Sequence, residues 1–222
     1  MKSNMNIENL EDKINYKFND KNILIKAITH SSFDKNNYEN LEFLGDSILG
    51  FVVAEYLFKN FDFNEGSLSK TRAKIVSASN LCKVANNLGI KDFLRLGNSF
   101  KNMAISNNIL ADCVESIIAG IYLDSNILNA QKFILNHIIV SYENITNIVN
   151  STIDYKTQLQ EKFQKSGVCK IEYITISQEG KSNNSIFTVE LKINDKVLTT
   201  QNGKSKHEAE QKCAMDVLSN KN

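Results

Sequence analysis

The chain has 222 residues, of which 42% are hydrophobic and 23% charged, an ordinary composition for a globular protein with a buried core. This length exceeds the usual size of one domain and falls short of two full ones, so we expect one larger and one smaller domain. The net charge is +1, with 15 basic against 16 acidic residues up to residue 150 and 11 against 9 after it, so bulk charge does not indicate a nucleic-acid partner.

Targeting signals and disulfide patterns are missing from the sequence. Residues 1–18 lack the apolar core of a signal peptide, and no apolar run reaches the roughly 18 residues of a membrane span. The four cysteines are widely spaced without a CxxC pair, and three lie in apolar surroundings typical of buried thiols. We therefore expect a cytoplasmic protein with no membrane partner.

The first part of the chain, up to about residue 142, has apolar residues at helical spacing. Long segments lack the period-2 alternation of strands and are separated by short polar breaks, and Gly89 is a predicted helix stop. The predicted helical segments are 41–59, 71–88 and 109–123, with breaks at 60–66 and 97–108. This pattern predicts an all-α domain over residues 1–147.

Residues 144–152 are polar and unpatterned, which predicts a linker. After it, the spacing changes to a short amphipathic helix, three strands and a final helix. Their predicted bounds are 156–165, 171–176, 187–193, 196–200 and 205–218, with strand breaks at 180–185 and 194–195. Residues 153–222 are therefore a predicted small α+β (α-β-β-β-α) domain.

Two of the predicted helices carry acidic pairs in otherwise apolar surroundings. The first contains Glu42 and Asp46 four residues apart, and the second contains Asp112 and Glu115 three residues apart. Either spacing puts both acids on one helix face. A helix that is apolar on every side is expected to be buried, and a buried carboxylate must be protonated, paired or bound to a cation.

Neither apolar stretch contains a lysine or arginine that could pair with these acids locally. If the two helices pack together, the four carboxylates can converge on a site suited to Mg²⁺, for which Mn²⁺ can substitute, because both ions prefer oxygen ligands. Such ions activate water and stabilise in-line phosphoryl displacement. The alternative is that the acids face solvent or pair with a base elsewhere in the fold, and the spacing leaves it open.

Longer motifs in this part of the chain resemble the signature of bacterial ribonuclease III. The matching segments are AITHSSF at 27–33, ENLEFLGDS at 39–47, EGSLS at 65–69, RA at 72–73 and, within 109–124, ILAD, a glutamate at 115 and IYLD. The resemblance implies a homodimeric, all-α endonuclease domain that cuts double-stranded RNA to 5′-phosphate and 3′-hydroxyl ends. It implies no organic cofactor.

The resemblance also assigns roles to the acids. Asp46 and Glu115 match the positions usually named as catalytic. The family's metal ligands match Glu42, Asp46, Asp112 and Glu115. Glu39 and Glu65 match two secondary acids near the cleft, whereas a lone histidine beside serines, such as His30, is more often structural. The chain departs from the family pattern at Asn40, where a basic residue is usual, and over the loop 98–103.

The second domain resembles the double-stranded RNA-binding domain. The matching residues lie at 156–161, at Gly180, and at 203–206 with 209–210. Ser205 and Glu208 predict a capping box that starts the final helix. Contacts to phosphates and 2′-hydroxyls of A-form RNA are expected, with little sequence readout. The residues expected to contact RNA are Gln160, Glu161, Asn183, Lys204, Lys206 and His207; the alternative for the lysines is a solvated helix start.

A homodimer is expected because a duplex presents two strands related by local twofold symmetry, and two copies give each strand its own site. We expect the first short helices and the helix over 42–59 to form the interface. The competing function is a catalytically silent RNA-binding scaffold, which would be expected to lose the acids; all four are present. Precursor ribosomal RNA and other structured transcripts are the substrates that the resemblance implies.

Overall fold

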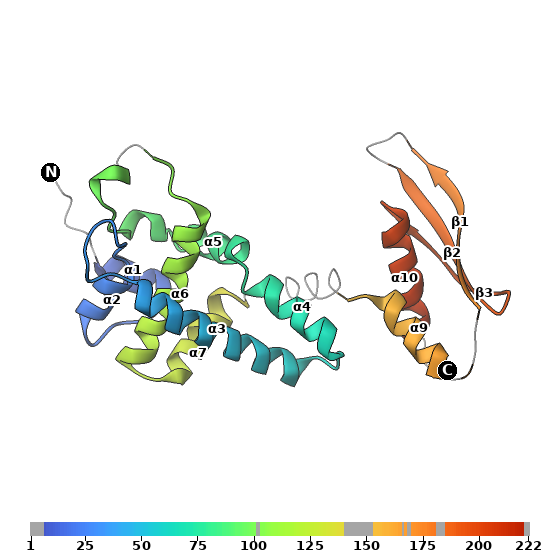
Figure 1. The fold of residues 1–222 in the computed structure, drawn as a ribbon, viewed down its shortest axis with the longest axis horizontal. Helices are drawn as coiled ribbons and strands as arrows, with labels where there is room; N and C mark the ends of the chain where they lie inside the picture. The colour runs from blue at the N-terminus through green and yellow to red at the C-terminus, as the bar shows by residue number, and fades with distance from the viewer. Residues whose placement is uncertain are drawn as a thin grey trace. The chain divides into compact units, whose positions relative to one another are not determined.

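The computed structural model describes residues 7–100, 103–139, 153–165, 167, 170–180 and 185–219. The chain divides into two compact units, Met1–Thr152 and Ile153–Asn222 (Figure 1). The first unit is helical and the second has the order helix, three strands, helix, so the predicted fold class is confirmed. The predicted linker at 144–152, and the predicted end of the first domain at residue 147, lie outside the described residues.

The helical unit is assembled around one central helix, α6. This helix contacts α2, α3, α5 and α7, and its described residues from Leu110 to Ile121 are mostly buried. The elements of the unit are α1 (Ile7–Ile14), α2 (Lys21–Ala27), α3 (Glu39–Asn60), α4 (Glu65–Ile75), α5 (Ala78–Asn87), η1 (Ile90–Phe93), η2 (Asn98–Phe100), α6 (Asn107–Asp124) and α7 (Ile127–His137). The expected burial of an all-apolar helix is confirmed for α6.

The expectation that an all-apolar helix is buried is wrong for α3, one face of which is exposed in a single copy of the chain. Phe43, Phe51 and Phe58 leave 77%, 60% and 77% of their surface exposed. At 3.6 residues per turn these three side chains fall within roughly 80° of arc, so they form one face of the helix. The opposite side of α3, with Gly45, Leu49 and Val52, packs into the unit, chiefly against α6.

The predicted helical segment 71–88 is interrupted. Helix α4 ends at Ile75 and α5 begins at Ala78, because Ser77 takes an extended backbone conformation and its side chain accepts a hydrogen bond from the Asn80 amide. The Asn80 side chain in turn donates to the Ile75 carbonyl at 2.8 Å. Gly89, with φ of 64°, follows the end of α5 and confirms the predicted helix stop.

The second unit consists of α9 (Tyr155–Lys165), β1 (Ile171–Glu179), β2 (Ile186–Ile193), β3 (Lys196–Gly203) and α10 (Lys206–Ser219). The strands form an antiparallel sheet in the order β1-β2-β3, and β1 contains a bulge near Thr175. Asn194 and Asp195, both at positive φ, make the tight β2–β3 turn at the predicted break. The buried core joins sheet and helices: Leu159, Val189, Leu191, Ala209, Cys213 and Ala214.

Cys82, Cys113 and Cys213 are free and buried, as predicted for three of the four thiols, and Cys169 lies outside the described residues. Within the described ranges, no helix has both the length and the apolar composition needed to cross a membrane.

Candidate active site and RNA-binding surface

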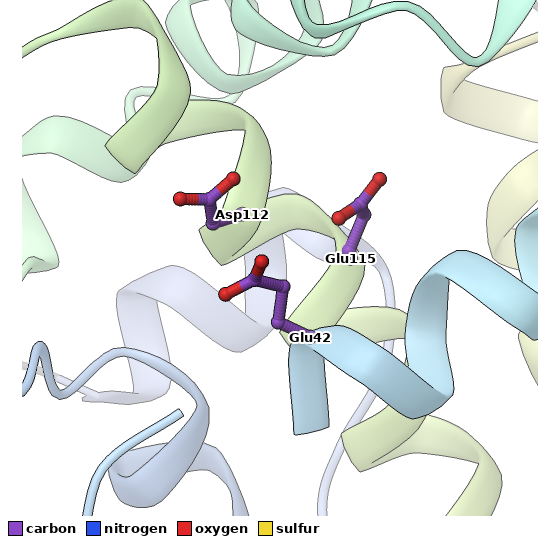
Figure 2. Close-up of side chains that lie close together, drawn as sticks. All are labelled: Glu42, Asp112 and Glu115. Carbon is purple, nitrogen blue, oxygen red and sulfur yellow. The ribbon is translucent and has the colours of Figure 1, made fainter. Parts of the chain in front are cut away.

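Three carboxylates meet where α3 packs against α6. Glu42 projects from the start of α3, and Asp112 and Glu115 project from α6 (Figure 2). Each offers an oxygen, and these three oxygens lie within 4.8 Å of one another. All three side chains are partly buried, so the acids are crowded and only partly screened by water.

Gly45 allows this approach of the two helices. A Cβ atom at this position would lie 1.8 Å from the Glu115 carbonyl oxygen, so only glycine fits. Gly45 lies one turn of α3 from Glu42, and the close contact therefore places the acidic end of α3 directly over Glu115. The site is thus fixed by rigid helices rather than by loops.

Burial raises the pKa of every acid in the cluster, and neighbouring negative charges raise those of Glu42 and Glu115 further. Burial, followed by the charges of Asp46, Asp112 and Glu42, raises the pKa of Glu115 to about 8. Burial and neighbouring acids raise the pKa of Glu42, and burial raises that of Asp112 against the opposing influence of His30. Crowding therefore favours protonation of the cluster unless a cation compensates the charge.

The remaining predicted acids take different positions. Asp46 is exposed one turn beyond Glu42; it lies outside the group of three but close enough for its charge to raise the pKa values of Glu42 and Glu115. Glu39, the first residue of α3, is exposed and also raises the pKa of Glu42. Glu65 begins α4, beyond the far end of α3, where it accepts a hydrogen bond from Ser69 at 2.8 Å.

The donor set suits a hard divalent cation. All of the clustered donors are carboxylate oxygens, and none of the ion pairs among the described residues involves Glu42, Asp46, Asp112 or Glu115. The alternative in which a distant base neutralises these acids is therefore not seen in the described part of the chain. Carboxylates that are crowded, half-buried and unpaired with a base fit an ion such as Mg²⁺ or Mn²⁺.

Tyr38 borders the cluster and was not singled out from the sequence. Its side chain is buried at the start of α3, and burial together with the charges of Asp112, Cys113, Glu42 and Glu39 raises the pKa of its phenol. A tyrosine before an acidic helix carries no recognisable motif, so only the fold could reveal this contact.

The start of α10 presents exposed basic residues. Lys204, Lys206 and His207 are exposed, and Ser205 accepts a hydrogen bond from the Glu208 amide at 3.1 Å. The Glu208 carboxylate accepts from the Lys204 amide at 2.9 Å, one residue earlier than in the predicted capping box. The helix start is therefore fixed as expected, with one altered partner.

Gln160 and Glu161 are exposed on α9, the first helix of the second unit. Helix α10 packs on the sheet and α9 packs against α10, with Leu159 of α9 in the shared core, and Gln160 and Glu161 are left on the surface. Asn183, the predicted contact between β1 and β2, lies outside the described residues.

Comparisons with known proteins agree with this architecture. Residues 20–142 match the family model described as Ribonuclease-III-like, and residues 155–221 match the double-stranded RNA binding motif. A helical domain with clustered acids, followed by this motif, defines the class of ribonuclease III-like proteins. The chain belongs to the ribonuclease III family.

Two similar proteins match nearly the whole chain, and a solved structure matches its first part. The chain is 43% identical to ribonuclease 3 of Caldanaerobacter subterraneus subsp. tengcongensis, over 95% of this chain and 96% of that protein. It is 40% identical to ribonuclease 3 of Clostridium tetani, over 99% and 97% of the two chains. A solved nuclease domain of ribonuclease III from Campylobacter jejuni, described for flexibility in a region involved in dimer formation, is 42% identical with a TM-score of 0.60; it covers 62% of this chain and 99% of that one.

Proposed function

We propose that the protein is an endoribonuclease that requires a divalent cation and hydrolyses phosphodiester bonds of double-stranded RNA to 5′-phosphate and 3′-hydroxyl ends. The observation that carries the proposal is the cluster of Glu42, Asp112 and Glu115 in a chain that also matches the double-stranded RNA binding motif. Its substrates are structured transcripts such as ribosomal RNA precursors, and its place of action is the cytoplasm.

The proposed cation is Mg²⁺, for which Mn²⁺ can substitute. Glu42, Asp112 and Glu115 would hold it, with Asp46 completing the set from the exposed edge of α3. When bound, the cation supplies Lewis-acid activation of water and charge stabilisation at the phosphate. Glu115, whose pKa is raised to about 8, would give up its proton to the solvent as the cation binds, so cation affinity rises with pH.

The catalytic roles of Asp46 and Glu115 belong to this proposal. The backbone of Glu115 is held by the α3–α6 contact at Gly45, whereas Asp46 is exposed beside the cluster. Glu39 is a secondary acid on the same helix. Glu65 begins α4 at the other end of α3 from Glu42, so in this proposal it acts at the edge of the cleft rather than as a ligand.

We also propose a homodimer formed through the exposed phenylalanine face of α3. Phe43, Phe51 and Phe58 form an apolar surface that a second copy of the chain would cover. A twofold axis beside α3 would place one acid cluster on each strand of a duplex. The proposal centres on α3, because the apolar residues Leu10 and Ile14 of α1 are buried within their own unit; a contribution from the first short helices stays a prediction.

Analytical ultracentrifugation tests the dimer. The wild-type protein is expected to sediment as a dimer at micromolar concentration, and replacing Phe51 and Phe58 with serine is expected to yield monomers. Replacing the exposed Leu128 of α7 with serine is the control. A wild-type protein that sediments only as a monomer would contradict the proposal.

The second unit is proposed to bind the duplex through α9, the β1–β2 connection and the start of α10. The residues proposed to contact RNA are Gln160, Glu161, Asn183, Lys204, Lys206 and His207. The exposed lysines suit phosphates, and the polar groups of α9 suit 2′-hydroxyls. Such contacts recognise the A-form shape with little sequence readout.

A labelled RNA hairpin incubated with the protein, with Mg²⁺ or with EDTA, tests the function. Cleavage is expected only with Mg²⁺, and the products should be substrates for enzymes that require a 5′-phosphate and a 3′-hydroxyl. A single-stranded RNA of the same composition is the control. Binding of the hairpin without cleavage under any divalent cation would favour the alternative, a catalytically silent scaffold.

A further inference from the structure

His30 is held in one orientation by hydrogen bonds to its Nδ1 atom. The backbone amide of Ser32 donates to Nδ1 at 3.0 Å, and the Ser32 hydroxyl lies 2.8 Å from the same atom. The Gly97 amide donates to the Ser32 Oγ at 3.0 Å. Because a backbone amide can only donate, Nδ1 is the acceptor, and the neutral imidazole carries its proton on Nε2.

Two aromatic rings hold the imidazole from its sides. Tyr38 and Phe100 make edge contacts with His30, with ring centroids 5.7 Å and 5.3 Å away. Phe100 belongs to the loop over 98–103 that departs from the family pattern. The altered loop therefore contributes directly to the surroundings of this histidine.

The backbone segments around residues 28–32 and 95–97 lie close together. The His30 amide donates to the Arg95 carbonyl at 3.1 Å, and the Arg95 amide donates to the Ile28 carbonyl at 2.8 Å. A Cβ atom on Gly97 would lie 2.3 Å from the Ser32 carbonyl oxygen, so glycine is required there. These contacts fix the position of the ring as well as its tautomer.

The other ring nitrogen has no such partner. His30 is partly exposed, and within the described residues no acceptor lies within hydrogen-bond distance of Nε2. The ring is close enough to Asp112 to oppose the rise in the pKa of that carboxyl. The Nε2–H group of His30 is therefore a hydrogen-bond donor held beside the acid cluster without an acceptor among the described residues.

We propose that His30 binds the substrate: its Nε2–H donates to a phosphate oxygen of the RNA strand that is cut, beside the phosphate held at the acid cluster. This inference rests on the proposed function. The acid cluster repels the RNA backbone, and the fixed Nε2–H donor next to it offsets that repulsion at one phosphate. The Nδ1 edge of His30 is structural, and the Nε2 edge is the part assigned to RNA.

Three substitutions separate the two edges of the ring. His30→Ala removes both. His30→Asn keeps a polar group near Nδ1 for Ser32 but has no donor at the Nε2 position, whereas His30→Gln can place an amide donor near that position. In single-turnover cleavage we expect Ala and Asn to lower the rate about 10- to 100-fold, as for a lost hydrogen bond to a charged group, and Gln to lower it less. Ser31→Ala, at the exposed neighbouring residue, is the matched control and should leave the rate unchanged.

Hairpins with a single neutral methylphosphonate locate the contact. At the phosphate that His30 contacts, the methylphosphonate is expected to slow cleavage by the wild type, and His30→Ala should then slow it no further. At other positions the effects of the methylphosphonate and of His30→Ala on the rate should multiply. Nitrogen-15 NMR of the free protein is expected to show the imidazole proton on Nε2.

A His30→Asn variant that cuts at the wild-type rate would show that only the Ser32 contact matters and would overturn the inference. The inference would also be overturned if His30→Ala lowered the cleavage rate equally at every methylphosphonate position and excess Mg²⁺ restored that rate. His30 would then act through Asp112. If the wild type fails to cut any duplex, the proposed function falls, and this contact falls with it. If the wild type cuts and His30→Asn matches it, only the contact is lost.

Discussion

The helical unit gathers three carboxylates in the partly buried contact between α3 and α6, whereas the small α+β unit leaves its basic residues exposed at the start of α10. In the first unit burial raises the pKa values of the three acids, and neighbouring negative charges raise those of Glu42 and Glu115 further. In the second unit, the acid nearest the basic residues, Glu208, is bound to the Lys204 amide and to Lys212, and its pKa falls.

This difference indicates that the helical unit gains more from binding its cation than the second unit gains, per residue, from binding RNA. The acid cluster is electrostatically unfavourable by itself and becomes favourable when a cation is bound, so single substitutions there should change activity by large factors. The exposed lysines are solvated by water when RNA is absent, so their charges carry little electrostatic penalty. Each lysine should therefore contribute a small, salt-dependent part of the affinity for RNA.

The largest effect is expected from the acids. Asp46→Asn or Glu115→Gln should reduce cleavage of a labelled hairpin by about a thousand-fold or more, because each removes a negative ligand from the proposed cation site. Binding of the duplex, measured by gel shift, should persist since most of the proposed RNA contacts belong to the other unit. Glu39→Gln, at the secondary acid, should lower the rate far less. If either principal variant cuts at the normal rate, its assignment is wrong.

The next effect concerns two glycines of α3. Gly45→Ala should destabilise the helical unit by about 3 kcal/mol or prevent its folding, because the added methyl group meets the Glu115 carbonyl. Gly50→Ala is the matched control: nothing lies within 4 Å of its Cβ position, so alanine should stabilise the helix by about 0.5–1 kcal/mol. Urea unfolding measures both, and equal effects would contradict the packing described for α3 and α6.

The third effect is a pH dependence of the cation-free protein. The pKa of Glu115 rises on folding from 4.5 to about 8, so the folded state holds the proton more tightly than the unfolded chain. The resulting stability is complete below about pH 4.5 and is lost as the pH rises through 8. Glu115→Gln should therefore raise the melting temperature in EDTA at pH 8.5 by about 3–6 °C, for about 1.5 kcal/mol after allowance for partial exposure.

The comparison of wild type and Glu115→Gln should be repeated at pH 5. There the wild-type carboxyl is largely protonated, and the two melting temperatures should converge. Mg²⁺ should stabilise the wild type more at pH 8.5 than at pH 5 and should stabilise the variant little. A difference between the two proteins that does not vary with pH would show that Glu115 is not crowded by its neighbours.

The smallest effect is expected from Lys206→Ala. This variant should weaken binding of all duplexes to a similar extent and reduce the slope of log affinity against log salt by about one, because one phosphate contact is lost. Lys196→Ala, an exposed lysine at the other end of β3 from the α10 start, is the control and should leave the slope unchanged. An unaltered slope for Lys206→Ala would exclude that phosphate contact.

Much of this architecture could be predicted from the sequence because its signals are local. The polar stretch before residue 153 separates the two units, and strand spacing appears only in the second. The i,i+4 and i,i+3 acid pairs lie on helices that do meet. The break within 71–88 could not be predicted, because a serine can lie inside a helix as well as at its start. Only the hydrogen bond that Ser77 accepts from the Asn80 amide identifies it as a helix cap.

Other features depend on contacts that no spacing encodes. The position of Asp46 outside the three-acid cluster follows from how α3 is rotated against α6, which Gly45 decides through a contact 70 residues away along the chain. The tautomer of His30 depends on Ser32 and on Gly97, which come together only in the fold. A histidine interpreted from sequence as structural can therefore have one edge bound to the protein and the other available to a ligand.

Binding of Mn²⁺ to the intact protein, followed by electron paramagnetic resonance at pH 8, tests the central claim most directly. The wild type is expected to bind the ion at the acid cluster of each chain, with Mg²⁺ competing, and Glu115→Gln is expected to bind it at least about tenfold more weakly. Equal binding by the two proteins would show that the crowded carboxylates of α3 and α6 do not form the cation site.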